Sequence, residues 1–414
     1  MRAAWHRRAA AAVAVMVTVI ASSTQVTAGS RLWTRDGVAD FIYSPQAGAI
    51  GGPPTGYRPE SKLFFTPDRR WWGVFADRAG DVSLFQQVDH RWTRRLRLPG
   101  SDPWMKADAL FHRKSRTLYV ALRDNGSTQT NPRRSLLYRL DYQRRGWRLR
   151  SSPSLITTDN PETLTLARDS NRRLWVTFET GGLIRVGFTR PGGTRFRFKT
   201  LASGVASDDI STLIAYDERI GVMWSNQNTG VFRFASRRDE TGPATDKQAG
   251  FGRSRVAYGN GVGQCPRNDA CADDHISLRA RGGRLYAAVK TSLNDATSPS
   301  GGDPLVVLLR RGSRGSWSAF EVADVAAGNV TQPILLLAPG LDALYVFATR
   351  SGVKVWRSAL TSPNFSGPPV QWTSMGTNYA TSTKQLIAPS TGAVVVTSNP
   401  KTREYWHNEF LPSN

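Results

Sequence analysis

The chain of 414 residues carries 55 Lys and Arg against 32 Asp and Glu, which gives a formal net charge of +23. A positive field of this kind attracts polyanions such as acidic polysaccharide or nucleic acid. The basic residues come in short pairs rather than one long tract, so a solvated basic surface without a dedicated polyanion site is the alternative. Gly (37) and Pro (23) are plentiful and long segments with a helical period are absent, which argues against a helical fold and favours short strands joined by turns.

Residues 1–28 have the pattern of a secretory signal peptide. Arg2, Arg7 and Arg8 precede an apolar run over 9–21, which is too short to cross a bilayer, and small residues precede Gly29. We therefore expect a cleaved bacterial-type signal and a secreted, extracellular domain over 29–414, with an uncleaved anchor as the alternative. No later apolar run is long enough to span a membrane, so no membrane anchor is expected after cleavage.

A two-strand pattern recurs along the chain after the signal. Each copy is an apolar run, a short turn rich in Asp, Arg, Gly or Ser, and a second run rich in β-branched and aromatic residues, which predicts an antiparallel hairpin. The seven copies begin at Leu63, Ala109, Leu164, Leu213, Ile276, Leu335 and Leu386. A third apolar stretch often follows, and in several copies a fourth, which predicts the four-stranded blade of a β-propeller.

The two ends of the chain predict how the ring closes. The last copy has three clear strands, and residues 32–44 offer one more, so we expect this N-terminal strand to complete the last blade. The predicted fold is therefore an all-β, seven-bladed β-propeller, expected to be a monomer. Six blades is the alternative, because the segment 237–254 is long and irregular.

The sequence has two cysteines, Cys265 and Cys271, with five residues between them. In an exported protein this spacing predicts a disulfide. A zinc site that used His275 would need more ligands nearby, so no metal and no cofactor is expected. Calcium bound by the paired aspartates before the fourth and fifth copies is the alternative.

The polar residues just before each first strand are the candidate site. First strands line the channel of a propeller, so these residues converge on one mouth of it from seven directions. We expect His275 and Asp274 as candidate catalytic residues there. The candidate ligand-binding residues are Trp104, Lys106, Asn160, Glu162, Asp208, Asp209, Asp273, Gln332, Lys384 and Gln385. The alternative is structural: such side chains cap backbone amides and tie neighbouring blades together.

Residues 250–412 resemble the repeat region of a family of exported bacterial proteins of largely unassigned function, broadly among sialidase-like, BNR-type propellers. The stretches DDHISL, GRLYAAVKTS, TQPILLL and YWHNEF carry the resemblance. It implies a secreted bacterial β-propeller and no assigned reaction. The Asp-box pattern S-x-D-x-G-x-x-W is missing, and the adjacent Glu404 and Tyr405 would point to opposite faces of a strand, which argues against sialidase chemistry.

Three functions remain open. The favoured one is binding of a glycan or another cell-surface or extracellular ligand at the channel mouth, with a neutral or anionic polysaccharide as partner and no specific nucleic acid. The second is an extracellular carbohydrate-active enzyme, a glycoside hydrolase or a uronate polysaccharide lyase, in which a cation neutralises the carboxylate and His275 moves protons. The third is a protein–protein interaction scaffold.

Overall fold

The computed structural model describes residues 37–48, 52–56, 59–124, 134–144, 146–239, 250–267, 269–374 and 376–412. The predicted signal peptide and the first part of the expected closing strand lie outside these residues. Among the described residues, no helix has the length and apolar character that crossing a membrane requires. Four short 3-10 helices are described: η1 (Pro45–Gly48), η2 (Gln227–Thr229), η3 (Leu293–Asp295) and η4 (Pro339–Leu341).

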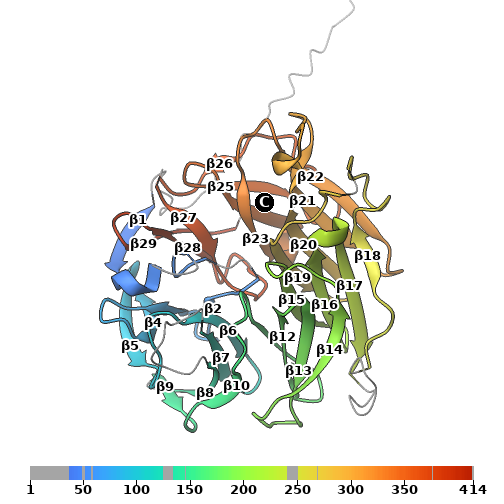
Figure 1. Cartoon of the computed structure of the whole chain (residues 1–414). Helices are drawn as coiled ribbons and strands as arrows, with labels where there is room; N and C mark the ends of the chain where they lie inside the picture. The colour runs from blue at the N-terminus through green and yellow to red at the C-terminus, as the bar shows by residue number, and fades with distance from the viewer. Residues whose placement is uncertain are drawn as a thin grey trace, which may run out of the picture.

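Seven antiparallel sheets are arranged radially around a channel, which confirms the seven-bladed β-propeller (Figure 1). Blade 1 has β2 (Leu63–Phe65), β3 (Trp71–Ala76), β4 (Val82–Val88) and β5 (Arg91–Arg97). Blade 2 has β6 (Lys106–His112), β7 (Thr117–Arg123), β8 (Ser135–Gln143), β9 (Gly146–Leu149) and β10 (Ser154–Thr157). Blade 3 has β11 (Thr165–Arg168), β12 (Leu174–Thr180), β13 (Leu183–Phe188) and β14 (Arg197–Ser203).

The remaining blades follow in chain order. Blade 4 has β15 (Ser211–Tyr216), β16 (Arg219–Asn226), β17 (Val231–Arg238) and β18 (Arg255–Tyr258). Blade 5 has β19 (Ile276–Arg281), β20 (Arg284–Lys290), β21 (Pro304–Arg311) and β22 (Trp317–Asp324). Blade 6 has β23 (Thr331–Ala338), β24 (Ala343–Thr349), β25 (Val353–Ala359) and β26 (Val370–Gln371). Blade 7 has β27 (Asn378–Thr381), β28 (Ala393–Asn399), β29 (Glu404–Phe410) and β1 (Val38–Ile42).

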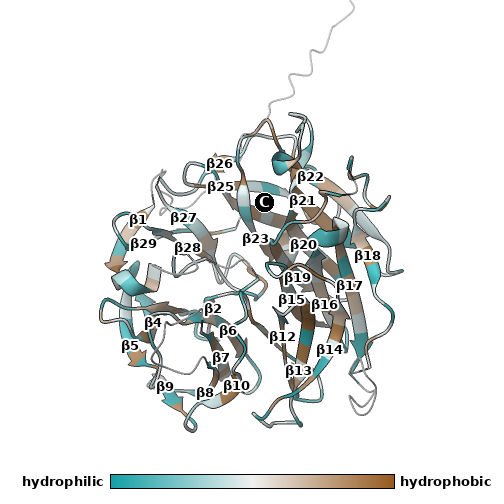
Figure 2. Cartoon of the chain, in the orientation of Figure 1, coloured by the Kyte–Doolittle hydropathy of each residue, from teal (hydrophilic) through white to brown (hydrophobic). Residues whose placement is uncertain are grey.

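The hydrophobic core lies between neighbouring blades, because each sheet buries both of its faces against the next. The strands carry most of the hydrophobic residues, whereas many of the connecting turns are hydrophilic (Figure 2). Successive side chains of a strand point to opposite faces. Trp71 therefore packs in the cluster that includes blade 7, while Trp72 packs against Trp147 of blade 2.

The N-terminal strand closes the ring, as the sequence predicts. β1 pairs antiparallel with β29, with Val38 opposite His407 and Ala39 opposite Trp406. Phe41 stacks on Phe85 of blade 1, with ring centroids 4.4 Å apart, so β1 also packs across the junction to the next blade. The closed ring leaves only short outer edges.

The predicted disulfide between Cys265 and Cys271 is present and lies between β18 and β19. Cys271 is fully buried, so this small loop is anchored in the core of blades 4 and 5. We expect Cys265→Ala/Cys271→Ala to lose about 2 kcal/mol of unfolding free energy, because closing so short a loop removes little chain entropy from the unfolded state. Chemical denaturation with and without reductant measures this loss. An unchanged midpoint in the double variant would show that the loop holds without its cross-link.

Candidate functional site

The chain itself closes one end of the channel. The segment 59–62, which leads into β2, crosses to the first strands of blades 2 and 3. Ser61 N donates to Asp108 Oδ1 at 2.8 Å, and Ala109 N donates to the Ser61 carbonyl oxygen at 2.7 Å. Glu60 Oε1 accepts from Leu164 N at 3.2 Å. These contacts make the segment a floor across the channel.

Buried charges hold this floor in place. Arg123 Nε donates to Glu60 Oε1 at 2.7 Å, and both side chains are fully buried. Lys384 Nζ binds the Asp108 carboxylate and donates to the Leu166 carbonyl oxygen at 2.9 Å. Arg279 donates to Ser61 Oγ at 3.2 Å and to the Thr383 carbonyl oxygen at 3.0 Å. The floor therefore ties blades 1, 2, 3, 5 and 7 to one another.

Burial is the largest cause of the pKa shifts of Arg279, Lys384 and Asp108. It lowers the pKa of Arg279 to about 10, partly offset by the charge of Asp108, so the guanidinium stays charged at neutral pH. It also lowers the pKa of Lys384, and the charge of Asp108 opposes this shift. Burial raises the pKa of Asp108, which Lys384 offsets. Asp108 and Lys384 therefore each stabilise the charged form of the other.

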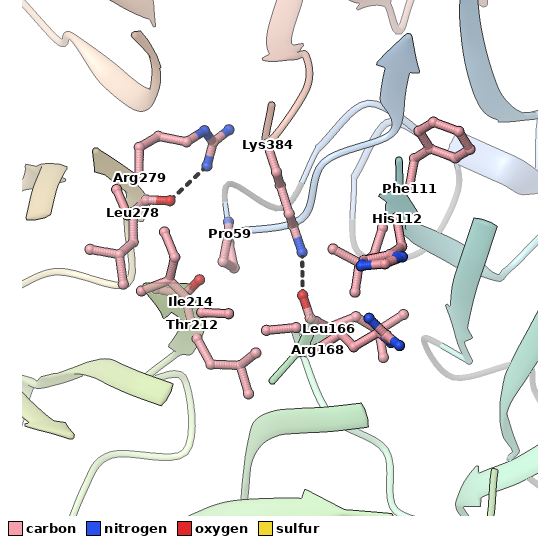
Figure 3. Close-up of a pocket in the computed structure, with 15 residues that line it drawn as sticks. Pro59, Phe111, His112, Leu166, Arg168, Thr212, Ile214, Leu278, Arg279 and Lys384 are labelled. Carbon is pink, nitrogen blue, oxygen red and sulfur yellow. Dashed lines mark hydrogen bonds between the residues drawn. The ribbon is translucent and has the colours of Figure 1, made fainter. Parts of the chain in front are cut away.

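Beyond the floor, a cavity of about 190 Å³ opens at the other end of the channel. The later residues of the inner strands β6, β11, β15 and β19 line it, together with Pro59 and Lys384 (Figure 3). We call this cavity the cup. Its wall is apolar at Leu110, Ile214 and Leu278, and its polar side chains are His112, Arg168, Thr212, Arg279 and Lys384. Among the described residues that line the cup, none is acidic.

Two residues of the cup have unused hydrogen-bonding capacity. Arg168 Nε is buried and has no hydrogen-bond partner among the described residues. His112 Nδ1 accepts from Ser115 N at 3.2 Å and lies 2.8 Å from Ser115 Oγ, so in the neutral ring Nε2 carries the hydrogen. Burial lowers the pKa of His112, with further lowering by the charges of Arg168 and Lys114, which keeps the ring neutral at neutral pH. The cup thus offers N–H donors.

At blades 2 and 3 the two faces of the ring differ in charge. We call the side with the first-to-second and third-to-fourth strand turns the turn face, and the side where the chain enters each first strand the entrance face. The cup opens toward the turn face. On the turn face the turns of blades 2 and 3 carry, within the described residues, Arg113, Lys114, Arg116, Arg144, Arg172, Arg173, Arg190 and Arg195 against one acid, Asp169.

The connections on the entrance face that lead into blades 2 to 5 have the opposite sign. Where described, the connections leading into blades 2 to 5 carry one cation, Arg267, against Asp102, Asp159, Glu162, Asp208, Asp209, Asp269, Asp273 and Asp274. The net charge of +23 is therefore unevenly distributed. Near blades 2 and 3, an anionic ligand is therefore attracted to the turn face rather than to the entrance face.

The Asp-Asp-His stretch on the entrance face forms a tightly bonded group. His275 Nδ1 lies 3.0 Å from Asp273 Oδ1 and contacts Asp274, while Nε2 lies 3.0 Å from Thr331 Oγ1 of blade 6. Lys290 Nζ binds the other oxygen of Asp273. Burial alone would raise the pKa of Asp273. The hydrogen bonds from His275 and Asp274 and the charges of His275 and Lys290 outweigh burial and hold the pKa below its ordinary value, so the carboxylate stays ionised. The three potential ligand atoms lie within 4.8 Å of one another, but Lys290 already supplies the cation.

Three other predicted site residues contact backbone. Lys106 Nζ donates to the Ala47 carbonyl oxygen at 2.5 Å and the Gly52 carbonyl oxygen at 3.2 Å. Asp209 accepts from Ala206 N at 2.7 Å. Gln385 bonds both the N–H and the carbonyl oxygen of Phe65, at 2.8 and 3.0 Å. These contacts join neighbouring segments, as capping and tethering side chains do.

The rest of the predicted set is spread over the entrance face. Asn160 and Asp208 are exposed, Trp104 and Glu162 are half-buried, and Gln332 is buried at the start of β23. Of all the predicted residues, Lys384 lines the cup. His112 and Arg168 were not predicted. The sequence could have indicated them, because each is the last residue of an inner strand. The prediction considered only the residues before those strands.

No protein-family model matches the chain, and no curated protein matches its sequence. The WD40 repeats of RRP9 share 11% identity with a TM-score of 0.51, over 86% of this chain and 96% of that one. The polysaccharide lyase Uly1 shares 10% identity with a TM-score of 0.49, over 92% and 98%. A prolyl endopeptidase structure shares 10% identity with a TM-score of 0.47 over 87% of this chain, which spans about half (52%) of its length. At 11% identity, the likeness to the RRP9 repeats supports the propeller fold alone, so the resemblance to sialidase-like propellers stays a prediction.

Proposed function

We propose that this protein binds an acidic extracellular glycan through its turn face, with one sugar unit that bears a carboxylate or sulfate held in the cup. The observation that carries the proposal is the cup itself: Arg168, His112 and Lys384 line it and no described lining residue is acidic. The extracellular setting follows the predicted signal peptide over 1–28. The disulfide is compatible with it.

The chemistry of the cup suits such a ligand. A guanidinium can donate two parallel hydrogen bonds to a carboxylate or sulfate, and Arg168 places such a group in the wall of the cup. The neutral His112 adds an N–H donor without a competing acidic group. Pro59, Leu110 and Ile214 offer apolar surface to the C–H face of a sugar ring. A cavity of about 190 Å³ accommodates one unit rather than a folded chain.

Arg168→Gln is expected to weaken binding of a trigalacturonate by roughly 10- to 100-fold. The variant loses a charge-assisted hydrogen bond worth about 1.5–3 kcal/mol. Isothermal titration calorimetry measures the affinity, with the neutral maltotriose as the ligand control. Arg403→Gln is the matched protein control, because Arg403 is an exposed arginine in the β28–β29 turn of the entrance face.

Two results would contradict the proposal. If neither uronate nor sulfated oligosaccharides bind the wild-type protein, the protein is not a receptor for acidic glycans. If they bind and Arg168→Gln leaves the affinity unchanged, the cup is not where they bind.

A further inference from the structure

A second cavity, of about 320 Å³, lies between blades 1 and 2 and opens toward the same turn face as the cup. We call it the groove. Arg70 from the β2–β3 turn and Arg144 from the β8–β9 turn stand at its rim, and Arg95 of β5 lies along it. All three arginines are exposed. The groove therefore carries three guanidinium groups in a cavity larger than the cup.

One wall of the groove is aromatic. Tyr142 and Trp147 lie against each other with ring centroids 4.8 Å apart, and both are half-buried. Trp147 meets the buried Trp72 edge to face, with centroids 5.6 Å apart, so the wall is rigidly backed by the core. Aromatic rings held in this way present apolar surface at little cost in conformational entropy. Such a surface suits the C–H face of a sugar ring.

The polar groups of the groove leave capacity for an anion. Arg95 Nε donates to Gln86 Oε1 at 3.0 Å, which orients the guanidinium and uses one of its five N–H groups. The nearby acid, Asp68, is already paired: it lies 3.1 Å from Arg70 Nε and accepts from the Tyr142 hydroxyl at 2.7 Å. Repulsion of an incoming anion by Asp68 is therefore reduced by its two partners.

A single turn separates the groove from the cup. The β6–β7 turn runs from His112, which lines the cup, to Arg116, whose guanidinium lies 5.6 Å from the ring centre of Tyr142 in the groove. Between them stand the exposed Arg113 and Lys114. Beneath the turn, Phe111 packs edge to face on Trp147 at 5.9 Å. Cationic side chains thus continue from one cavity to the other over a firmly packed base.

We infer that the groove is a second sugar subsite, and that the ligand is an acidic polymer long enough to occupy cup and groove together across the turn 113–116. This inference rests on the proposed function of the cup and adds the length of the ligand to it. The shared chemistry of the ligand is a polymer of sugar rings that bear carboxylates or sulfates. Two linked subsites bind a long chain more tightly than a short one, because the second contact is intramolecular.

The test is a chain-length series, from disaccharide to dodecasaccharide, of oligogalacturonates in one arm and heparin-derived oligosaccharides in the other. For the wild-type protein we expect the affinity in at least one arm to rise roughly tenfold or more with length. Arg95→Gln/Arg144→Gln should keep the wild-type affinity for the shortest ligand that binds and lose most of the rise. The matched control, Lys401→Gln/Arg403→Gln, replaces two exposed cations of the entrance face and should keep the full rise. Both arginines of the groove variant are exposed, so its thermal midpoint should equal that of the wild type.

The outcomes separate the two proposals. If short ligands bind and the affinity does not rise with length, the groove is not a second subsite, and the proposal for the cup is unaffected. A rise with length that the groove variant keeps also overturns the groove. Absence of binding in both arms overturns the proposed function. Single-stranded DNA of matched charge tests whether the ligand must be a sugar. If the DNA binds equally well, with the same dependence on length and on Arg95 and Arg144, the assignment to sugars is overturned in favour of a general polyanion surface.

Discussion

Replacing Glu60 by Gln is expected to lower the free energy of unfolding by about 3–5 kcal/mol. The carboxylate of Glu60 is fully buried, lies 2.7 Å from Arg123 Nε and 3.4 Å from Lys62 Nζ, and accepts from Leu164 N at 3.2 Å. Gln keeps the shape and one acceptor, but it removes the negative charge that faces the buried Arg123 and Lys62. Removing one member of a buried ion pair is costly because the remaining charge stays desolvated.

Chemical denaturation followed by tryptophan fluorescence measures the loss. Arg123→Met removes the other member, and the double variant Glu60→Gln/Arg123→Met should lose less than the sum of the two single variants, because it removes both charges together. Glu218→Gln, at an exposed position of the β15–β16 turn, should change the stability by less than about 0.5 kcal/mol. If Glu60→Gln is as mild as this control, the charged floor does not hold the blades together.

The blade pattern could be predicted because it is local. Each hairpin appears in the sequence as two apolar runs around a turn, so seven copies predict seven blades, and a last copy one strand short predicts the closing role of β1. Opposite orientations of Trp71 and Trp72 follow from strand alternation alone. Sequence spacing also predicts the disulfide between Cys265 and Cys271.

Which end of the channel is closed and which is open could not be predicted in this way. Glu60 and Arg123 are 63 residues apart, and Asp108 and Lys384 are 276 apart, so no periodic pattern links them. The floor depends on where the connection from β1 to β2 runs after β1 has joined blade 7. Lys106, the first residue of β6, and Asp209, just before β15, therefore meet backbone, while His112 and Arg168, the last residues of β6 and β11, line the cup.

The closing strand should give the protein an alkaline limit of stability. His407 of β29 is fully buried, and its Nδ1 lies 2.7 Å from Asp40 Oδ2 of β1. Glu409 lies 3.5 Å from Nε2 and also contacts His90, and Arg91 adds a positive charge near Asp40. Burial lowers the pKa of His407, but its hydrogen bonds and the charges of Asp40 and Glu409 prevail and raise the pKa to about 9.

This shift sets both the sign and the size of the effect. A histidine whose pKa rises from 6.5 to about 9 on folding stabilises the protein fully below pH ~6.5 and loses that stabilisation as the pH rises through 9. The shift corresponds to about 3 kcal/mol. Burial raises the pKa of Asp40, and the hydrogen bond and charge of His407 oppose this shift, so deprotonation of His407 leaves the Asp40 carboxylate with less compensation. The free energy of unfolding should therefore fall between pH 7 and pH 10.

His407→Asn isolates this contribution. Two buried lysines oppose this fall: burial lowers the pKa of Lys62, and of Lys106 much further, so their contribution to stability rises with pH. The variant keeps both lysines, so the difference in unfolding free energy between wild type and variant, measured by urea denaturation at each pH, reports on His407. We expect about 3 kcal/mol at pH 7, shrinking toward zero at pH 10. A difference that stays constant over this range would mean that His407 holds β1 through packing alone and carries no charge in the folded protein.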